Sequence, residues 1–266
     1  MNEAMKVRIR QLASRPALQG LWLNLSKLSY AGMNYGGGQM VHDSGELEAL
    51  AFALKAVKSS ESFVVFDVGA NTGSYLELAL PLLGDKAKAY CFEPQPINAR
   101  ILEARFAQDP RVILREAALG REVKTADLFF STEGEPTASF HGNGNSAGAQ
   151  SINVPVTTVD QVSDETSIAR IDMLKIDAEG HEMDVLLGAT RMMQGDRISS
   201  IQFEFGETFV QTNYHFRDVY DLLSSRYRIY RILRRGLLEL RSYSYDLEVY
   251  KLANFLCVHK SFEIPG

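Results

Sequence analysis

The sequence predicts an α/β protein in which a mostly parallel sheet is covered by helices on both faces. Three observations support this fold class. Apolar, strand-like runs alternate with helical patterns from residue 62 onward, acidic residues stand at the ends of these runs, and a turn with two glycines follows the first run. Such alternation with apolar strands is typical of parallel sheets that are buried on both faces.

The first helix of this domain is predicted at residues 44–58, where Ser44 is a good N-cap and apolar residues recur at helical spacing. The remaining elements follow from short apolar runs and from the helical patterns between them. We expect strands at 63–67, 88–92, 112–116, 126–131, 171–176, 200–205, 228–233 and 254–259, and helices at 74–81, 96–107, 182–192 and 216–225.

Composition excludes several classes of protein. The chain has 266 residues, 45% apolar and 23% charged, which is an ordinary globular balance. We find no apolar run long enough to span a membrane and no signal-peptide pattern. A net charge of −5 argues against a nucleic-acid partner. Cys91 and Cys257 lie in apolar runs, so we expect buried thiols without a disulfide and a cytoplasmic location.

Residues 1–45 are predicted to form a helical extension and substrate lid, and residues 46–266 to form the α/β domain. The extension holds five basic residues around the apolar stretch from Leu18 to Leu28. It is either a helix at a membrane interface or a helix packed on the domain with a solvated basic face, and we expect the second. His42 and Asp43, which follow a glycine cluster at 36–38, could fold over a site, and so could Asn213, Tyr214 and His215, although we expect each group to be an ordinary loop.

A polar segment at residues 132–150 is rich in Gly, Ser, Thr and Asn and has little apolar content. Loops of this length are usually functional or flexible. The segment is therefore either a loop that covers a substrate or a plain insertion.

The turn from Asp67 to Gly73 is the most informative local feature. Its two glycines are four residues apart, whereas the dinucleotide signature needs glycines at the first, third and sixth positions. It also lacks the lysine of a phosphate-binding loop. Bare main chain at Gly69, Ala70, Asn71, Thr72 and Gly73 allows a ligand to approach, and the exposed N–H groups attract a carboxylate. Asp67 can hold an ammonium group, so the ligand has an amino-acid end.

The ends of the next two strands suggest the rest of this ligand. Glu93, followed by Pro94, can accept two hydrogen bonds from a ribose diol, although it could equally be an acid that caps the next helix. Glu116 or the main chain at Ala117 could meet the edge of an adenine. An amino acid, a ribose and an adenine together describe S-adenosyl-L-methionine, which we predict as the cofactor.

Six motifs occur in order and resemble the FkbM-type S-adenosylmethionine-dependent methyltransferase family over residues 61–260: FDVGANTG, CFEPQP, REAALG, VPVTTVDQV, IDMLKIDAEGHEMDVLLGA and NFLCVHK. The resemblance implies a class I Rossmann-like methyltransferase fold, with a seven-stranded sheet whose last strand is antiparallel. It also implies O-methylation of a hydroxyl on a sugar, a glycan or glycolipid, or a polyketide-type natural product. The partner is then a small-molecule or carbohydrate acceptor, and the oligomeric state is left open.

Three residues after the fourth strand are candidates for catalysis, because a hydroxyl needs to lose its proton during attack. His181 can accept a proton at neutral pH. Asp177 could orient the hydroxyl or touch the methionine end, and Glu179 could hold His181 or bind substrate. Alternatively, His181 and Glu182 simply begin the next helix. We expect no metal, although Asp177, Glu179 and Glu204 offer the oxygen ligands that hard cations prefer.

Two other functions remain open on the sequence alone. A nicotinamide oxidoreductase could use the same sheet, but the glycine pattern argues against it. A catalytically weak module could bind S-adenosylmethionine without turnover, and the acids and the histidine of the fourth strand argue against that.

Overall fold

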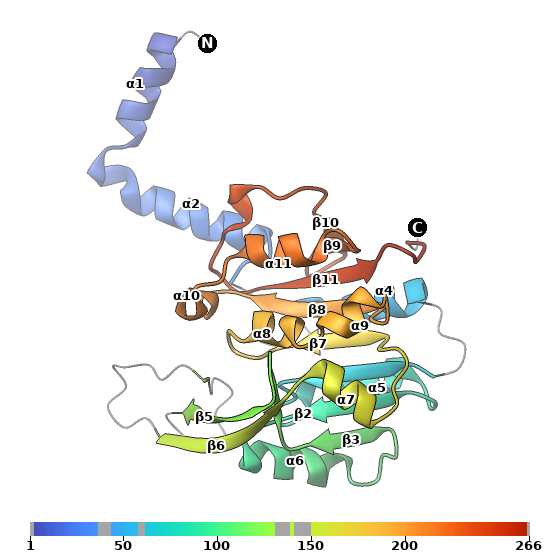
Figure 1. Ribbon diagram of the computed structural model, residues 1–266. Helices are drawn as coiled ribbons and strands as arrows, with labels where there is room; N and C mark the ends of the chain where they lie inside the picture. Colours follow the sequence, from blue (N-terminus) through green and yellow to red (C-terminus); the bar gives the residue numbers. More distant parts are fainter. Residues whose placement is uncertain (1–2, 37–43, 58–61, 131–138, 141–149, 265–266) are drawn as a thin grey trace.

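The protein is a three-layer α/β domain from which a helical arm extends (Figure 1). The computed structural model describes residues 3–36, 44–57, 62–130, 139–140 and 150–264. The eight-stranded main sheet has the order β10-β9-β11-β8-β7-β1-β2-β3. Its strands are β1 (Val64–Val68), β2 (Lys88–Phe92), β3 (Val112–Arg115), β7 (Met173–Ile176), β8 (Ser200–Phe205), β9 (Tyr227–Ile232), β10 (Leu237–Glu239) and β11 (Ala253–His259).

The predicted seven-stranded sheet is confirmed, and β10 adds a short eighth strand at one edge. Strands β1, β2, β3, β7 and β8 are mutually parallel, while β11 runs antiparallel to both β8 and β9. The chain leaves β1 toward β2 on one side and returns to β7 on the other. Ligands of open α/β sheets bind at such a switch point, beyond the carboxyl ends of the strands.

Two apolar cores fill the spaces between the sheet and its helices. On one face, α4 (Glu46–Val57), α5 (Ser74–Leu83) and α6 (Pro96–Phe106) pack through residues such as Leu50 and Leu76. On the other face lie α7 (Val159–Glu165), α8 (Glu182–Leu187), α9 (Thr190–Gln194) and α11 (Phe216–Leu223). Both cysteines are free and buried in these cores, as predicted.

A second, three-stranded sheet was predicted only in part. It has the order β4-β6-β5, with β4 at Ala118–Leu119, β5 at Lys124–Phe130 and β6 at Gln150–Thr157. The strand expected at 126–131 is β5, but its partner β6 and the helix α7 that follows were missed. Thr158 caps α7 by accepting a hydrogen bond from the Gln161 N–H, 3.0 Å away. In Figure 1 the β5–β6 ribbon projects from the carboxyl edge of the main sheet.

The single helix expected at 182–192 is in fact two helices, α8 and α9, separated at Gly188. A Cβ at this glycine would overlap the main-chain oxygen of Gly120, so the break lets the chain pass close to the end of β4. The Gly188 carbonyl also accepts a hydrogen bond from the N–H of Asp160, 3.0 Å away. Helical periodicity alone contains no sign of this contact.

The N-terminal arm consists of α1 (Glu3–Ala13), a short 3-10 turn (Pro16–Leu18) and α2 (Gln19–Gly32), and it leads away from the sheet (Figure 1). The expectation that this helix packs on the domain holds only near the end of α2: no residue of α2 is fully buried, but Tyr30 packs against the core. His42, Asp43 and two of the three clustered glycines lie outside the described residues. No helix of the described residues is long and apolar enough to cross a membrane.

Candidate functional site

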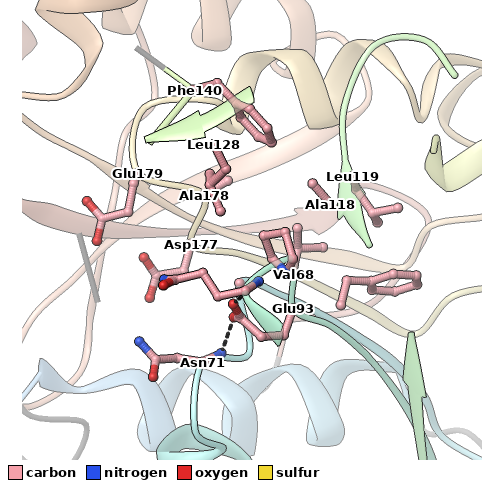
Figure 2. A pocket seen from close by; sticks show the side chains of 14 residues that line it. Val68, Asn71, Glu93, Ala118, Leu119, Leu128, Phe140, Asp177, Ala178 and Glu179 are labelled. Atoms are coloured by element: carbon pink, nitrogen blue, oxygen red, sulfur yellow. Dashed lines mark hydrogen bonds between the residues drawn. The ribbon is translucent and has the colours of Figure 1, made fainter. Parts of the chain in front are cut away.

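A cavity opens at the carboxyl ends of β1, β2 and β7, under the second sheet. Asp177 and Glu179 lie on one side of it, Ala118 and Leu119 lie on the opposite side, Glu93 lies between them, and Phe140 lies above (Figure 2). Its lining comes from β-strand ends and the loops after them: Val68, Gly69, Asn71, Phe92, Glu93, Pro94, Gln95, Ala118, Leu119, Leu128, Phe140, Asp177, Ala178 and Glu179. The site therefore lies where the fold predicts a ligand.

The turn after β1 brings main chain to the cavity wall. The N–H groups of Gly69 and Ala70 both donate to the carbonyl of Phe92, at 3.0 and 3.1 Å. The N–H groups of Asn71, Thr72 and Gly73 also have protein acceptors, so the expectation of exposed N–H groups that attract a carboxylate is wrong. Gly69 has φ +74°, and a Cβ there would overlap the main-chain oxygen of Asp177. Only glycine therefore allows the ends of β1 and β7 to meet this closely.

Glu93 is held rigidly at the floor of the cavity. Its Oε2 accepts from the Asn71 N–H at 2.8 Å and its Oε1 accepts from the Gln95 N–H at 2.9 Å. Burial raises the pKa of Glu93 to about 7, although these two hydrogen bonds oppose the shift. Each oxygen keeps a free lone pair, so the carboxylate can still accept from two hydroxyls, as a ribose diol requires.

An apolar slot lies beside Glu93. Phe92, Pro94 and Leu119 form one part of it, and Leu128 and Phe140 complete it. A flat aromatic base fits such a slot. The residues predicted for the adenine edge do not line it: Glu116 is exposed, Ala117 is half-buried, and the chain reaches the cavity only at Ala118. Leu128 and Phe140 were missed, since their contribution depends on the second sheet.

Asp67 lies below the cavity instead of in its wall. Strand β1 continues to Val68, one residue beyond the predicted end, and this places the Asp67 side chain within the layer between sheet and helix. The carboxylate is fully buried, and its Oδ1 lies 3.5 Å from Nζ of Lys175, the cross-strand neighbour on β7. Burial raises the pKa of Asp67, and Lys175 opposes that shift. The predicted contact of Asp67 with a ligand ammonium group stays a prediction.

Two of the three catalytic candidates lie together. Asp177 and Glu179 follow β7 and line the same side of the cavity (Figure 2). Burial, helped by the charges of Asp177 and Glu207, raises the pKa of Glu179 to about 7. Glu179 also has φ +50°, a strained value for a residue with a side chain, and such strain often occurs at functional sites. Glu204, at the end of β8, adds a half-buried acid whose pKa is raised, first by desolvation and then by the neighbouring acids.

His181 faces a neighbouring cavity together with Arg121, Lys124 and Asp184, and it does not line the cavity of Asp177. Its Nδ1 lies 3.3 Å from Oδ2 of Asp184, and its ring meets the ring of Phe140 edge-on at 5.0 Å. His181 is also the N-cap residue of α8. The structure therefore separates His181 from the other two candidates by the Phe140 side chain.

Hydrogen bonds from main-chain N–H groups to a buried glutamate hold the loop after β7. The Oε1 of buried Glu182 accepts from the N–H groups of Ala178, at 2.9 Å, and Gly180, at 3.2 Å.

The sequence leaves two other features of the site open, a cover from Tyr214 and a metal ion among the acids. Tyr214, which could have folded over the site, instead accepts a hydrogen bond from Arg121 and does not line the cavity. Within the described part of the chain, no group of three or more acidic, histidine or cysteine side chains is placed to hold a metal ion.

These features fit S-adenosylmethionine better than they fit a smaller ligand. The apolar slot suits an adenine, Glu93 suits the ribose hydroxyls, and the Gly69 turn leads toward Asp177, where an amino-acid end would lie. The acids around Asp177 also suit the positive charges of a sulfonium and an ammonium group.

Comparisons with known proteins agree with this geometry. The model of the FkbM methyltransferase domain matches residues 67–232, more than half of the chain. The hexuronic acid methyltransferase AglP of Haloferax volcanii is 24% identical over 162 residues, which cover 61% of this chain and 64% of that protein. The match thus spans less than two thirds of this relative.

Solved methyltransferase structures are similar in outline only. The plantazolicin methyltransferase BpumL, in complex with SAH, is 10% identical, with 93% of this chain and 92% of that chain covered and a TM-score of 0.45. The precorrin-6y C5,15-methyltransferase of Geobacter metallireducens is 11% identical, with 79% and 88% covered and a TM-score of 0.43. The assignment therefore rests on the family model, the strand order and the cavity: the chain belongs to the FkbM methyltransferase family, and its cofactor is S-adenosylmethionine.

Proposed function

We propose that this protein methylates a hydroxyl oxygen of a carbohydrate or a similarly hydroxylated small molecule, with Glu179 as the general base. The observation that carries this proposal is a carboxylate on the cavity wall with a pKa near neutrality, beside a second acid, Asp177. A general base is most effective when its pKa lies near the working pH. Membership of the FkbM family excludes the nicotinamide oxidoreductase that the sequence alone left open.

The cofactor residues in this proposal are those of the cavity. Glu93 accepts from the ribose hydroxyls, the apolar slot holds the adenine, and the amino-acid end lies beside Gly69 and Asn71, toward Asp177. When bound, S-adenosylmethionine supplies a methyl group on a sulfonium, so that an O–CH3 bond forms as the S–CH3 bond breaks. Glu179 takes the proton of the acceptor hydroxyl, and Asp177 orients that hydroxyl. His181 does not touch the reacting groups and supports the site by packing against Phe140.

The charge of the site favours a neutral hydroxyl over a carboxylate as the acceptor. Asp177 and Glu207 lie near Glu179, and the repulsion among the acids of this site contributes to the raised pKa values of Glu179 and Glu204. A carboxylate acceptor would add another negative charge, and it would need no base because it is already ionised. The name of the AglP relative supports an acidic sugar as the molecule, and this argument concerns which of its oxygens is methylated.

The test is an assay of the purified chain with S-adenosylmethionine and a panel of neutral sugars, hexuronic acids and macrolides. We expect a methylated product that resists mild alkali, because a methyl ether is stable there and a methyl ester is hydrolysed. Glu179→Gln should keep affinity for the demethylated cofactor and lose at least about a hundredfold in turnover. An alkali-labile product would contradict the hydroxyl acceptor. Cofactor binding without turnover on any acceptor would favour a binding module instead.

A further inference from the structure

The N-terminal arm carries an apolar surface with no partner in the described structure. Its apolar side chains are unusually exposed for their size: Leu12 52%, Leu21 52%, Trp22 42%, Leu23 60%, Leu25 43% and Leu28 70%. Leu21, Leu25 and Leu28 recur at spacings of four and three residues, which puts them on one face of α2. Lys27 points away from this face of the same helix.

This arm is built into the domain at its base. The side-chain amide of Asn34 donates to the carbonyls of Ser44 and Ile232, at 3.2 and 3.1 Å. Buried Tyr35 accepts a hydrogen bond from Arg231 at 2.8 Å, and Lys251 lies over the ring of Tyr30. The base of the arm is therefore held by the domain, and the arm leaves it in a fixed direction. The apolar side chains of α2 are exposed even though the end of this helix is attached to the domain.

The elbow between the two helices is also held. The indole N–H of Trp22 donates to the carbonyl of Ala13 at 2.6 Å, across the 3-10 turn. The side-chain amide of Gln19 donates to the carbonyls of Ser14 and Arg15, at 3.3 and 3.4 Å. These bonds hold the turn between α1 and α2 in one conformation.

The charge of the arm is opposite to that of the domain. Residues 1–36 contain five lysines and arginines and one acid, whereas the whole chain has 28 basic and 33 acidic residues. On α2, Leu21, Leu25 and Leu28 form one apolar face with Lys27 outside it, and the other basic residues lie on α1 and at the turn. An apolar helix face with basic residues nearby is typical of segments that lie in the interface of an anionic bilayer. Exposed apolar surface of this extent on a protein generally marks an interaction site.

We infer that residues 3–33 bind the surface of a membrane rich in anionic lipids, with Leu21, Leu25 and Leu28 inserted among the lipids and the basic residues near the head groups. This binding would hold the domain beside the membrane without a spanning helix. The inference is independent of the methyl acceptor, because the arm and the cavity share no residue.

Trp22 provides a direct readout, since it is the only tryptophan in the chain. Full-length protein is titrated with phosphatidylcholine vesicles that contain or lack phosphatidylglycerol, and tryptophan emission and co-flotation are recorded. We expect a shift of the emission to shorter wavelength, protection from iodide quenching and flotation with the anionic vesicles only. High salt should weaken the binding.

A matched pair of variants on α2 separates insertion from a general loss of hydrophobicity. Leu28→Gln, on the apolar face, should weaken vesicle binding about tenfold. Leu23→Gln, similarly exposed but on the other face, should leave it within about twofold. Both variants should keep the melting temperature and the affinity for the demethylated cofactor, because neither residue contacts the domain core.

Light scattering of the same samples tests the alternative occupant, a second copy of this chain. Equal binding by Leu23→Gln and Leu28→Gln would overturn the proposed face. A tryptophan spectrum that stays unchanged with every vesicle would contradict membrane binding. A dimer that Leu28→Gln converts to a monomer would show that the apolar face binds a second copy of the chain instead.

Discussion

Lys175 and Asp67 are cross-strand neighbours on β7 and β1, and their charged atoms lie 3.5 Å apart in a fully buried site. The same ammonium group lies 3.4 Å from Oδ2 of Asp177 and 5.0 Å from the ring centroid of Tyr75. Burial alone would lower the pKa of Lys175, but the charges of Asp177, Asp67 and Glu46 raise it above the ordinary value. Lys175 therefore stays protonated and links the buried layer to the cavity wall.

Removal of this cation should be strongly destabilising. Lys175→Met leaves Asp67 buried without a counter-charge, and we expect a loss of about 3–5 kcal/mol in the free energy of unfolding, measured in urea. The double variant Lys175→Met/Asp67→Asn should recover part of this loss, because the remaining polar group is neutral. If Lys175→Met unfolds at the same urea concentration as the parent chain, the pair contributes nothing.

Cofactor binding should become stronger as the pH rises through neutrality. The ionised carboxylate of Glu93 accepts from the ribose hydroxyls, and its pKa is raised to about 7 in the free protein. Affinity for S-adenosylhomocysteine should therefore rise up to about tenfold between about pH 6 and pH 8, measured by calorimetry. Glu93→Gln should bind weakly at both values and lose this dependence. An unchanged slope in Glu93→Gln would assign the effect to another group.

The same shift affects stability with the opposite sign. The Glu93 carboxyl has a pKa of about 7 in the folded protein against an ordinary value of 4.5, so it binds its proton more tightly when the chain is folded. Its contribution to stability is therefore largest below the lower value and is lost as the pH rises toward 7. In the absence of cofactor, Glu93→Gln should melt at a higher temperature than the parent chain at about pH 8, and the difference should vanish near about pH 4.

Gly69 should tolerate a side chain far less well than another glycine of similar φ. Gly69 has φ +74° and Gly36 has φ +71°, but a Cβ at Gly69 would overlap the Asp177 carbonyl, whereas a Cβ at Gly36 has nothing within 4 Å. Gly36→Ala should cost about 1–2 kcal/mol from the backbone alone. Gly69→Ala should cost more and abolish cofactor binding. Equal melting temperatures for the two variants would show that the ends of β1 and β7 separate easily.

The catalytic assignment predicts different results at two neighbouring positions. Turnover of the parent chain should rise with pH through about 7, because Glu179 acts in its ionised form. His181→Ala should keep this pH profile, with a rate reduced by less than about tenfold, since the histidine lies behind Phe140. If His181→Ala instead abolishes turnover and Glu179→Gln does not, the histidine is the base.

The main sheet could be predicted because its signals are local. Apolar runs that end near an acid identify β1, β2 and β7, and the glycine turn identifies the first loop. The predicted site residues Gly69, Asn71, Glu93, Pro94, Asp177 and Glu179 line one cavity. The sequence does not reveal how deeply each side chain is buried. Strand β1 ends at Val68, one residue later than predicted, so Asp67 lies in the interior and not at the rim of the cavity.

The remaining features depend on contacts between distant segments. Leu128 reaches the cavity only because β5 pairs with β6 across a long connection. The charge of Glu46 acts on Lys175 only after α4 has packed on the sheet. The division of one predicted helix into α8 and α9 likewise follows from a contact with Gly120. None of these three features can be predicted from a short stretch of sequence, because each depends on residues that are far apart in the chain.

The two walls of the cavity come from separate layers of the protein. Leu119 and Leu128 belong to the small sheet, whereas Asp177 and Glu179 follow a strand of the large one. Mutations in the small sheet can thus tune retention of the nucleoside while the proton-accepting machinery stays intact. A designer who wants this scaffold to accept enlarged synthetic methyl donors should randomise the leucine wall first and leave the carboxylates alone.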